Sequence, residues 1–135
     1  MKKLFIDSDV MLDAALVRKP FYLPAINLFE LCYEARFKAF TSSIAFINAS
    51  YFLNKLTPTT KIQSLKRLRS IISIIEVNET IIDLTLNSNF SDFEDAVQFY
   101  AAKTAKADVI ITRNIKDYTQ STIPVLTAEQ FLRSL

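Results

Sequence analysis

The stretch Asn89-Phe90-Ser91-Asp92-Phe93-Glu94-Asp95-Ala96 places three carboxylates within four residues, at the predicted start of a helix. Ser91 followed three residues later by Glu94 is typical of a capping box, in which each side chain accepts an amide proton that the helix start leaves free. Asp95 falls in the first turn, where the positive end of a helix stabilises acids. Apolar and small residues then recur at helical spacing and predict one buried stripe, on a helix that continues to about Lys106: Phe93, Ala96, Val97, Tyr100, Ala101 and Thr104.

Two further polar clusters stand elsewhere in the chain, each after a short apolar run. Asp7-Ser8-Asp9 follows Leu4-Phe5-Ile6, and the segment Thr112-Arg113-Asn114-Ile115-Lys116-Asp117 follows Val109-Ile110-Ile111. Each of the three clusters thus follows a turn or the end of a predicted strand. Such clusters can converge at one edge of a parallel sheet.

Predicted strands and helices alternate along the sequence. We expect strands at 3–6, 38–40, the second half of 71–77, 108–112 and 123–126, the last at a sheet edge because it contains a proline. We expect helices at 21–36, 43–55, 58–69 and 79–87, a short helix or turn at 10–16, a turn at 114–118, and a terminal helix with a capping box of Thr127 and Gln130. This alternation predicts an α/β protein with a parallel sheet of four to five strands between two layers of helices.

The amino-acid composition limits the kinds of active site that the chain can form. The chain has 135 residues, half of them apolar, with no histidine, no glycine and one cysteine, Cys32. One domain over residues 1–135 is therefore expected, without a disulfide, an imidazole base or a glycine-rich phosphate loop. Left-handed helix caps would have to fall on Asn or a similar residue. An active site, if present, is therefore expected to use carboxylates, and clustered carboxylates prefer to bind Mg²⁺ or Mn²⁺.

The hydropathy and the net charge give weaker indications of where the protein acts and on what kind of substrate. No apolar run is long enough to span a membrane, and Leu4-Phe5-Ile6 is too short for a signal-peptide core, so we expect a cytoplasmic protein. The net charge of +2 allows a basic surface beside an acidic site, as a nucleic-acid substrate would need. The most basic segment, 58–69, has two readings: a solvated face or a contact surface.

Two residues on predicted apolar stripes need separate comment. Cys32 shares a face with Ala25, Leu28 and Phe29 and is expected to be a small buried residue. Asn48 falls on a stripe that we expect to be buried, formed by Ile44, Ile47, Tyr51 and Phe52. Its amide needs a partner, which can be the backbone or a functional site.

The chain resembles a PIN domain, the small nuclease fold of the VapC-type toxins of bacterial toxin–antitoxin pairs. Three segments carry the resemblance: Leu4 to Val10, Asp92 to Ala96 and Ile110 to Tyr118. It implies a three-layer α/β/α fold and a metal-dependent ribonuclease site. Asp7, Asp95 and Asp117 would be the metal ligands and, with Asn114, the catalytic residues. Supporting roles would fall to Asp9, Asn48, Asp92, Glu94 and Thr112, and Arg113 and Lys116 could contact RNA phosphates.

One position departs from the family's pattern. The family usually has a second acid, a glutamate, on the helix after the second strand, and Asn48 stands at the matching position. An amide brings no charge, which should weaken Mg²⁺ binding. The alternative to a ribonuclease is thus a weak or inactive PIN-like module that binds RNA or protein, with nearby Glu94 or Asp92 as possible compensating acids.

The resemblance also implies partners: an RNA substrate, an antitoxin protein and a second copy of the chain in a homodimer. Apolar residues of 21–37 could form the dimer contact, or could belong to the core. A receiver-like α/β domain is a third interpretation of the acid pair at Asp7 and Asp9. It is disfavoured because the expected phosphoacceptor Asp and downstream Lys at strand ends are not evident.

Overall fold

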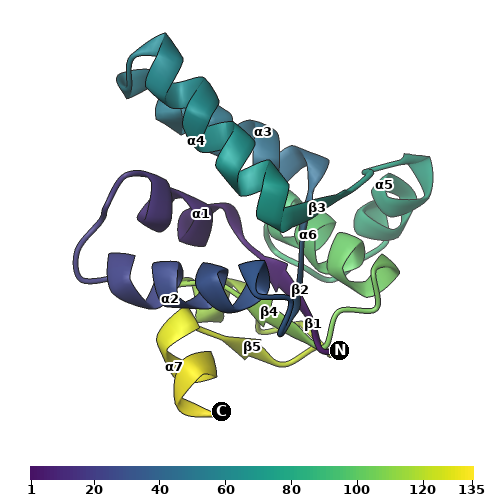
Figure 1. Ribbon diagram of the computed structural model, residues 1–135. Helices are drawn as coiled ribbons and strands as arrows, with labels where there is room; N and C mark the ends of the chain where they lie inside the picture. Colours follow the sequence, from purple (N-terminus) through teal and green to yellow (C-terminus); the bar gives the residue numbers. More distant parts are fainter.

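The computed structural model describes residues 1–135 and contains a sheet of five strands, all parallel, in the order β3-β2-β1-β4-β5 (Figure 1). The strands are β1 (Lys3–Ile6), β2 (Lys38–Ser42), β3 (Ile72–Ile75), β4 (Val109–Ile111) and β5 (Val125–Leu126). The chain runs from β1 outward to β3 and then returns to β4 on the other side of β1. The strand order therefore reverses between β1 and β4, and open α/β sheets place their ligand sites at such a point.

Helices cover both faces of this sheet, which gives the three layers that the sequence predicts. They are α1 (Ser8–Ala15), α2 (Tyr22–Tyr33), α3 (Ser43–Phe52), α4 (Pro58–Ile71), α5 (Glu79–Leu86), α6 (Phe93–Thr104) and α7 (Ala128–Arg133), with short 3₁₀ helices η1 (Leu53–Lys55) and η2 (Ile115–Tyr118).

Successive residues of β1 point to opposite faces and so separate the two hydrophobic cores. Leu4 and Ile6 belong to the larger core, which α1, α2, α3 and α7 help to form. Phe5 belongs to the smaller core, beneath α5 and α6. All three side chains are fully buried, as expected for a central strand of a parallel sheet. No helix is both long and apolar enough to cross a bilayer.

Several local predictions are confirmed. Strand β5 lies at an edge of the sheet. Thr127 and Gln130 form the capping box at the start of α7. Cys32 is buried, and burial raises the pKa of its thiol to about 11, which makes it a poor nucleophile. The bounds of α4 and β3 differ slightly from the prediction: the helix continues to Ile71, and the strand begins at Ile72.

The start of α6 differs from the predicted capping box. The residue that caps the helix is Asp92, whose Oδ1 accepts the amide proton of Asp95 at 2.9 Å. Asp is as good a cap as Ser, and the helix begins one residue later than the Ser91 pattern requires. The predicted stripe is also partly wrong: Phe93 is 51% exposed, whereas Phe99 and Ala102 are buried.

The predicted buried stripe of α3 is wrong. All four residues of that stripe are exposed, namely Ile44, Ile47, Tyr51 and Phe52, and the helix packs through buried Ala45 and Ala49 and half-buried Phe46. Small residues let this helix approach β2 and the rest of the core closely. The four residues of the stripe then remain on the outer side.

Left-handed caps occur without glycine or asparagine. Val17, Ala35 and Lys106 have φ angles of 54°, 61° and 56°. Each follows a helix, and each next amide donates to the carbonyl five residues earlier: Arg18 to Asp13, Arg36 to Leu31 and Ala107 to Ala102. The prediction that Asn or a similar residue would fill these positions is wrong, because satisfying the last carbonyls outweighs the local strain.

Candidate active site

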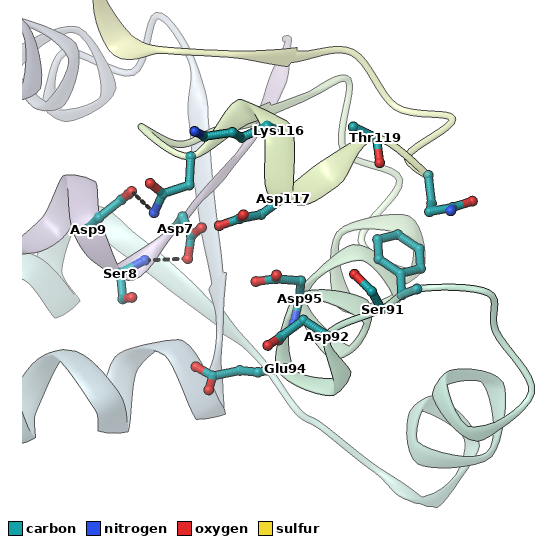
Figure 2. Close-up of a pocket in the computed structure, with 13 residues that line it drawn as sticks. Asp7, Ser8, Asp9, Ser91, Asp92, Glu94, Asp95, Lys116, Asp117 and Thr119 are labelled. Carbon is teal, nitrogen blue, oxygen red and sulfur yellow. Dashed lines mark hydrogen bonds between the residues drawn. The ribbon is translucent and has the colours of Figure 1, made fainter.

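The three polar clusters of the sequence meet at the carboxyl edge of the sheet, around a pocket of about 400 Å³ (Figure 2). Asp7 follows β1, Asp95 lies in the first turn of α6, and Asp117 lies in η2 after β4. Figure 2 shows these three side chains facing the same space. Most other predicted site residues also line the pocket: Asp9, Asp92, Glu94, Asn114 and Lys116.

Asp7 is the most firmly held of the acids. Its Oδ1 accepts the amide proton of Ser8 at 2.8 Å and so caps α1. Its Oδ2 accepts hydrogen bonds from Thr112 Oγ1 and from the Tyr118 hydroxyl, both at 3.0 Å. Burial raises the pKa of Asp7, and these hydrogen bonds oppose the rise because they stabilise the charged form.

Asp9 lies beside Asp7 and faces the segment after β4. Its Oδ2 accepts from Arg113 N at 3.0 Å and from Asn114 Nδ2 at 3.2 Å. Thr112 Oγ1 also lies within 3.3 Å of it, so a single hydroxyl proton serves both Asp7 and Asp9. Burial, and then the charge of Asp7, raise the pKa of Asp9 to about 6.

Asp95 lies among several other carboxylates. Burial and then the negative charges of its neighbours together raise its pKa to about 7, the neighbours being Asp92, Asp117, Asp7 and Glu94. Like charges held together favour protonation unless a cation neutralises them. The pocket is therefore suited to a positively charged ligand.

Asn48 lies outside the pocket lining, but it contacts a residue that belongs to it. Its Nδ2 donates to Glu94 Oε1 at 2.5 Å, which joins α3 to α6. Of the two partners that the sequence left open for this amide, the backbone and a functional site, the structure therefore gives it a carboxylate of the pocket. Figure 2 shows Glu94 extending towards α3, apart from the group of Asp7, Asp95 and Asp117.

The two basic residues after β4 differ in position. Lys116 lines the acidic pocket. Arg113 does not: its Nε lies 2.9 Å from Oδ2 of buried Asp13, and its guanidinium stacks 4.1 Å from the centre of the Phe21 ring. The predicted contact of Arg113 with RNA would have to break this ion pair, so Lys116 is the better placed cation.

The donor set of the pocket fits a divalent cation that retains water ligands. Only carboxylate, amide and hydroxyl oxygens are available, and Asp9 Oδ1 is a buried oxygen without a hydrogen-bond partner. The acids do not form a closed three-ligand group as they stand. Mg²⁺ commonly binds through one or two carboxylates and keeps several waters, so a closed cage is not required.

Sequence reasoning missed three residues that support the site. The Tyr118 hydroxyl donates a hydrogen bond to Asp7, and buried Asp13 forms an ion pair with Arg113. Gln98, also buried, accepts a hydrogen bond from Ser42 Oγ at 2.5 Å. Gln98 could have been found, because a polar residue one turn after Glu94 on a helix with a buried face needs a partner. Asp13 offers no such signal, since its partner is 100 residues away.

The chain belongs to the PIN domain family, since the family model matches residues 3–116. A protein of Aquifex aeolicus (strain VF5), named Ribonuclease VapC1, is 27% identical over 135 residues, which cover 96% of this chain and 93% of the relative. This match removes the ground for the receiver-like interpretation.

Solved structures agree on the fold. A toxin–antitoxin complex from Klebsiella pneumoniae matches 93% of this chain and 97% of its own, with a TM-score of 0.69 and 21% identity. VapBC2 from Rickettsia felis, bound to a DNA fragment from its promoter, matches 93% and 98% with a TM-score of 0.67 and 16% identity. At these identities the likeness concerns the fold.

Proposed function

We propose that this protein is a metal-dependent endoribonuclease that hydrolyses a phosphodiester bond in RNA, and that it acts as the toxin of a toxin–antitoxin pair. The observation that carries the proposal is the pocket that Asp7, Asp95 and Asp117 share at the strand-order reversal. The relative from Aquifex aeolicus supports it, because its name describes a ribonuclease.

In this proposal Asp7, Asp95 and Asp117 hold Mg²⁺ or Mn²⁺, and Asn114 supports them. A divalent cation supplies an activated water and stabilises the charge that develops at phosphorus. Thr112 and Tyr118 orient Asp7 through their hydrogen bonds to its Oδ2. Lys116, at the pocket rim, would bind an RNA phosphate next to the bond that is cut.

The proposal includes partners and a location. Residues 1–135 act as one domain, in the cytoplasm, where RNA is available. An antitoxin binds the protein and inhibits it in this proposal, which the similar VapBC2 and toxin–antitoxin complex structures support. A homodimer forms through the exposed apolar face of α3, where Ile47, Tyr51 and Phe52 lie on neighbouring turns, rather than through the 21–37 region, whose Ala25, Leu28 and Phe29 belong to the core.

The second candidate function is a PIN-domain module that binds RNA without cutting it. One observation favours it: residue 48 is an amide, so α3 contributes no carboxylate to the pocket. RNA that binds with micromolar affinity, but stays intact at every metal concentration, would favour this alternative.

The direct test is cleavage of a mixed RNA pool by the purified chain, with Mg²⁺, with Mn²⁺ and with a chelator. We expect cleavage with either metal, none with the chelator, and a loss of about 100-fold or more in Asp7→Asn. Cleavage that persists in the chelator, or in Asp7→Asn, would refute the proposed site.

A further inference from the structure

The hydrogen bond between Asn48 and Glu94 links α3 directly to the rim of the acidic pocket. The amide nitrogen donates to Oε1 of Glu94, and no hydrogen bond occupies Oε2. Glu94 lines the pocket together with Asp95, its neighbour in the first turn of α6.

An amide is the side chain that this position needs if Glu94 is to stay charged. A carboxylate at position 48, within hydrogen-bond distance of Glu94, would repel it and force one of the two to take up a proton. An amide instead donates a proton to the carboxylate and leaves the second oxygen free for a cation. The pair of Asn48 and Glu94 therefore places one negative charge, that of the Glu94 carboxylate, on the α3 side of the pocket.

A second side-chain hydrogen bond joins the two helices that carry this pair. Ser42 Oγ, at the start of α3, donates to Gln98 Oε1 of α6 at 2.5 Å, and both residues are buried. Ser42 also caps α3 through the amide of Ala45 at 2.9 Å. This second link holds the start of α3 against α6, so the distance between Asn48 and Glu94 does not depend on their own hydrogen bond alone.

Asp92 is the other acid that could serve this purpose, and its geometry differs. Its Oδ1 accepts from the amide of Asp95 and so caps α6. That role directs the carboxylate towards the start of its own helix. Glu94 has no such role, and its position depends on Asn48.

We infer that Glu94 supplies the fourth carboxylate of the metal site and that Asn48 is the positioning residue that holds it. This inference rests on the proposed function, since it concerns the same cation. Glu94 binds the cation directly or through one of its waters. Asn48 does not contact the cation, and it acts through Glu94.

The test is Mn²⁺ binding to the metal-free protein, residues 1–135, measured by electron paramagnetic resonance at pH 7.5. Glu94→Gln should weaken Mn²⁺ about 10-fold or more, because it removes a charge and keeps the shape. Asp92→Asn is the comparison variant: it removes a charge at the same rim, keeps the cap, and should weaken Mn²⁺ binding by a smaller factor than Glu94→Gln does. Asn48→Ala should weaken Mn²⁺ binding by a factor between those of Asp92→Asn and Glu94→Gln.

The double variant Asn48→Glu with Glu94→Gln separates this inference from a purely structural role. It exchanges the amide and the carboxylate, so the same hydrogen bond forms in the opposite direction and one charge remains. Mn²⁺ affinity within about 3-fold of the parent is expected. Thermal unfolding of each variant checks that the fold is retained.

The outcomes for Glu94 and for the site as a whole are distinct. If Asp7→Asn binds Mn²⁺ like the parent, the proposed metal site itself fails. If Asp7→Asn loses Mn²⁺ binding but Glu94→Gln and Asp92→Asn weaken it equally, the proposed metal site is supported. The inference that Glu94 is its fourth carboxylate is then wrong. Failure of the exchanged pair to recover affinity, with the fold intact, would also overturn the role of Asn48.

Discussion

Tyr118 and Thr112 determine how Asp7 faces the pocket. Both hydroxyls donate to the same carboxylate oxygen, and Tyr118 is almost fully buried while doing so. Groups that orient a metal ligand affect metal affinity although they never touch the metal.

Tyr118→Phe should therefore weaken Mn²⁺ on the order of 10-fold. It should also cost about 1 kcal/mol in the free energy of unfolding, since Asp7 Oδ2 loses one of its two hydrogen-bond donors. Calorimetric Mn²⁺ titration and urea unfolding measure the two effects. Tyr100→Phe is the control, because Tyr100 packs against Phe90 and Phe99 and its hydroxyl does not line the pocket; equal losses in both variants would contradict the role of Tyr118.

The raised pKa values of Asp9 and Asp95, about 6 and 7, predict how stability depends on pH. The folded, metal-free protein holds protons on these acids that the unfolded chain has released, so the free energy of unfolding should fall as pH rises from about 4 to 7. Asp95→Asn should remove part of this fall, on the order of 1 kcal/mol. Urea unfolding at four pH values in chelator measures it, and a stability that rises over this window would contradict the crowding of charge.

At the scale of elements, the sequence predicts strands and caps well where the signal is local. The apolar run before Asp7 and the Thr127–Gln130 box depend only on neighbours in the chain, and both are confirmed. The outward face of α3 could not be predicted, because an apolar stripe does not show whether it meets the core or a partner. Asp13 likewise depends on a contact that only the folded chain creates, because its partner Arg113 is distant in sequence.

Three helices end on left-handed residues that carry a side chain, and Val17 is the most strained because it is branched at Cβ. Val17→Gly should raise the free energy of unfolding by about 1 kcal/mol, since the relief of strain exceeds the added freedom of the unfolded chain. Ala14→Gly, within α1, should lower it by about 1 kcal/mol. Urea unfolding compares them; a destabilised Val17→Gly would show that no strain is stored there.

For the whole molecule, the order of the strands explains why acids distant in sequence meet. Asp7 and Asp117 lie at the ends of neighbouring strands β1 and β4, on either side of the reversal, and α6 brings Asp95 across the same edge. The sequence predicted this convergence from the three clusters. It could not predict that Arg113 turns away towards Asp13, since that depends on the packing of α1.

The exposed face of α3 predicts the oligomeric state. Ile47, Tyr51 and Phe52 are 61%, 72% and 54% exposed on neighbouring turns. Ile47→Glu should convert a dimer into a monomer, whereas Leu23→Glu on α2, equally exposed, should leave the dimer intact. Sedimentation velocity distinguishes them, and a parent that sediments as a monomer would refute the homodimer.

The measurement that tests the central claim most directly is RNA cleavage by Asp95→Asn beside Asp83→Asn, with saturating Mn²⁺. Both variants remove one carboxylate from a helix, but Asp83 is exposed on α5 outside the pocket. We expect Asp95→Asn to lose at least about 100-fold of the parent's rate and Asp83→Asn to retain it. Equal rates in the parent and in Asp95→Asn would contradict a nuclease site built on these acids.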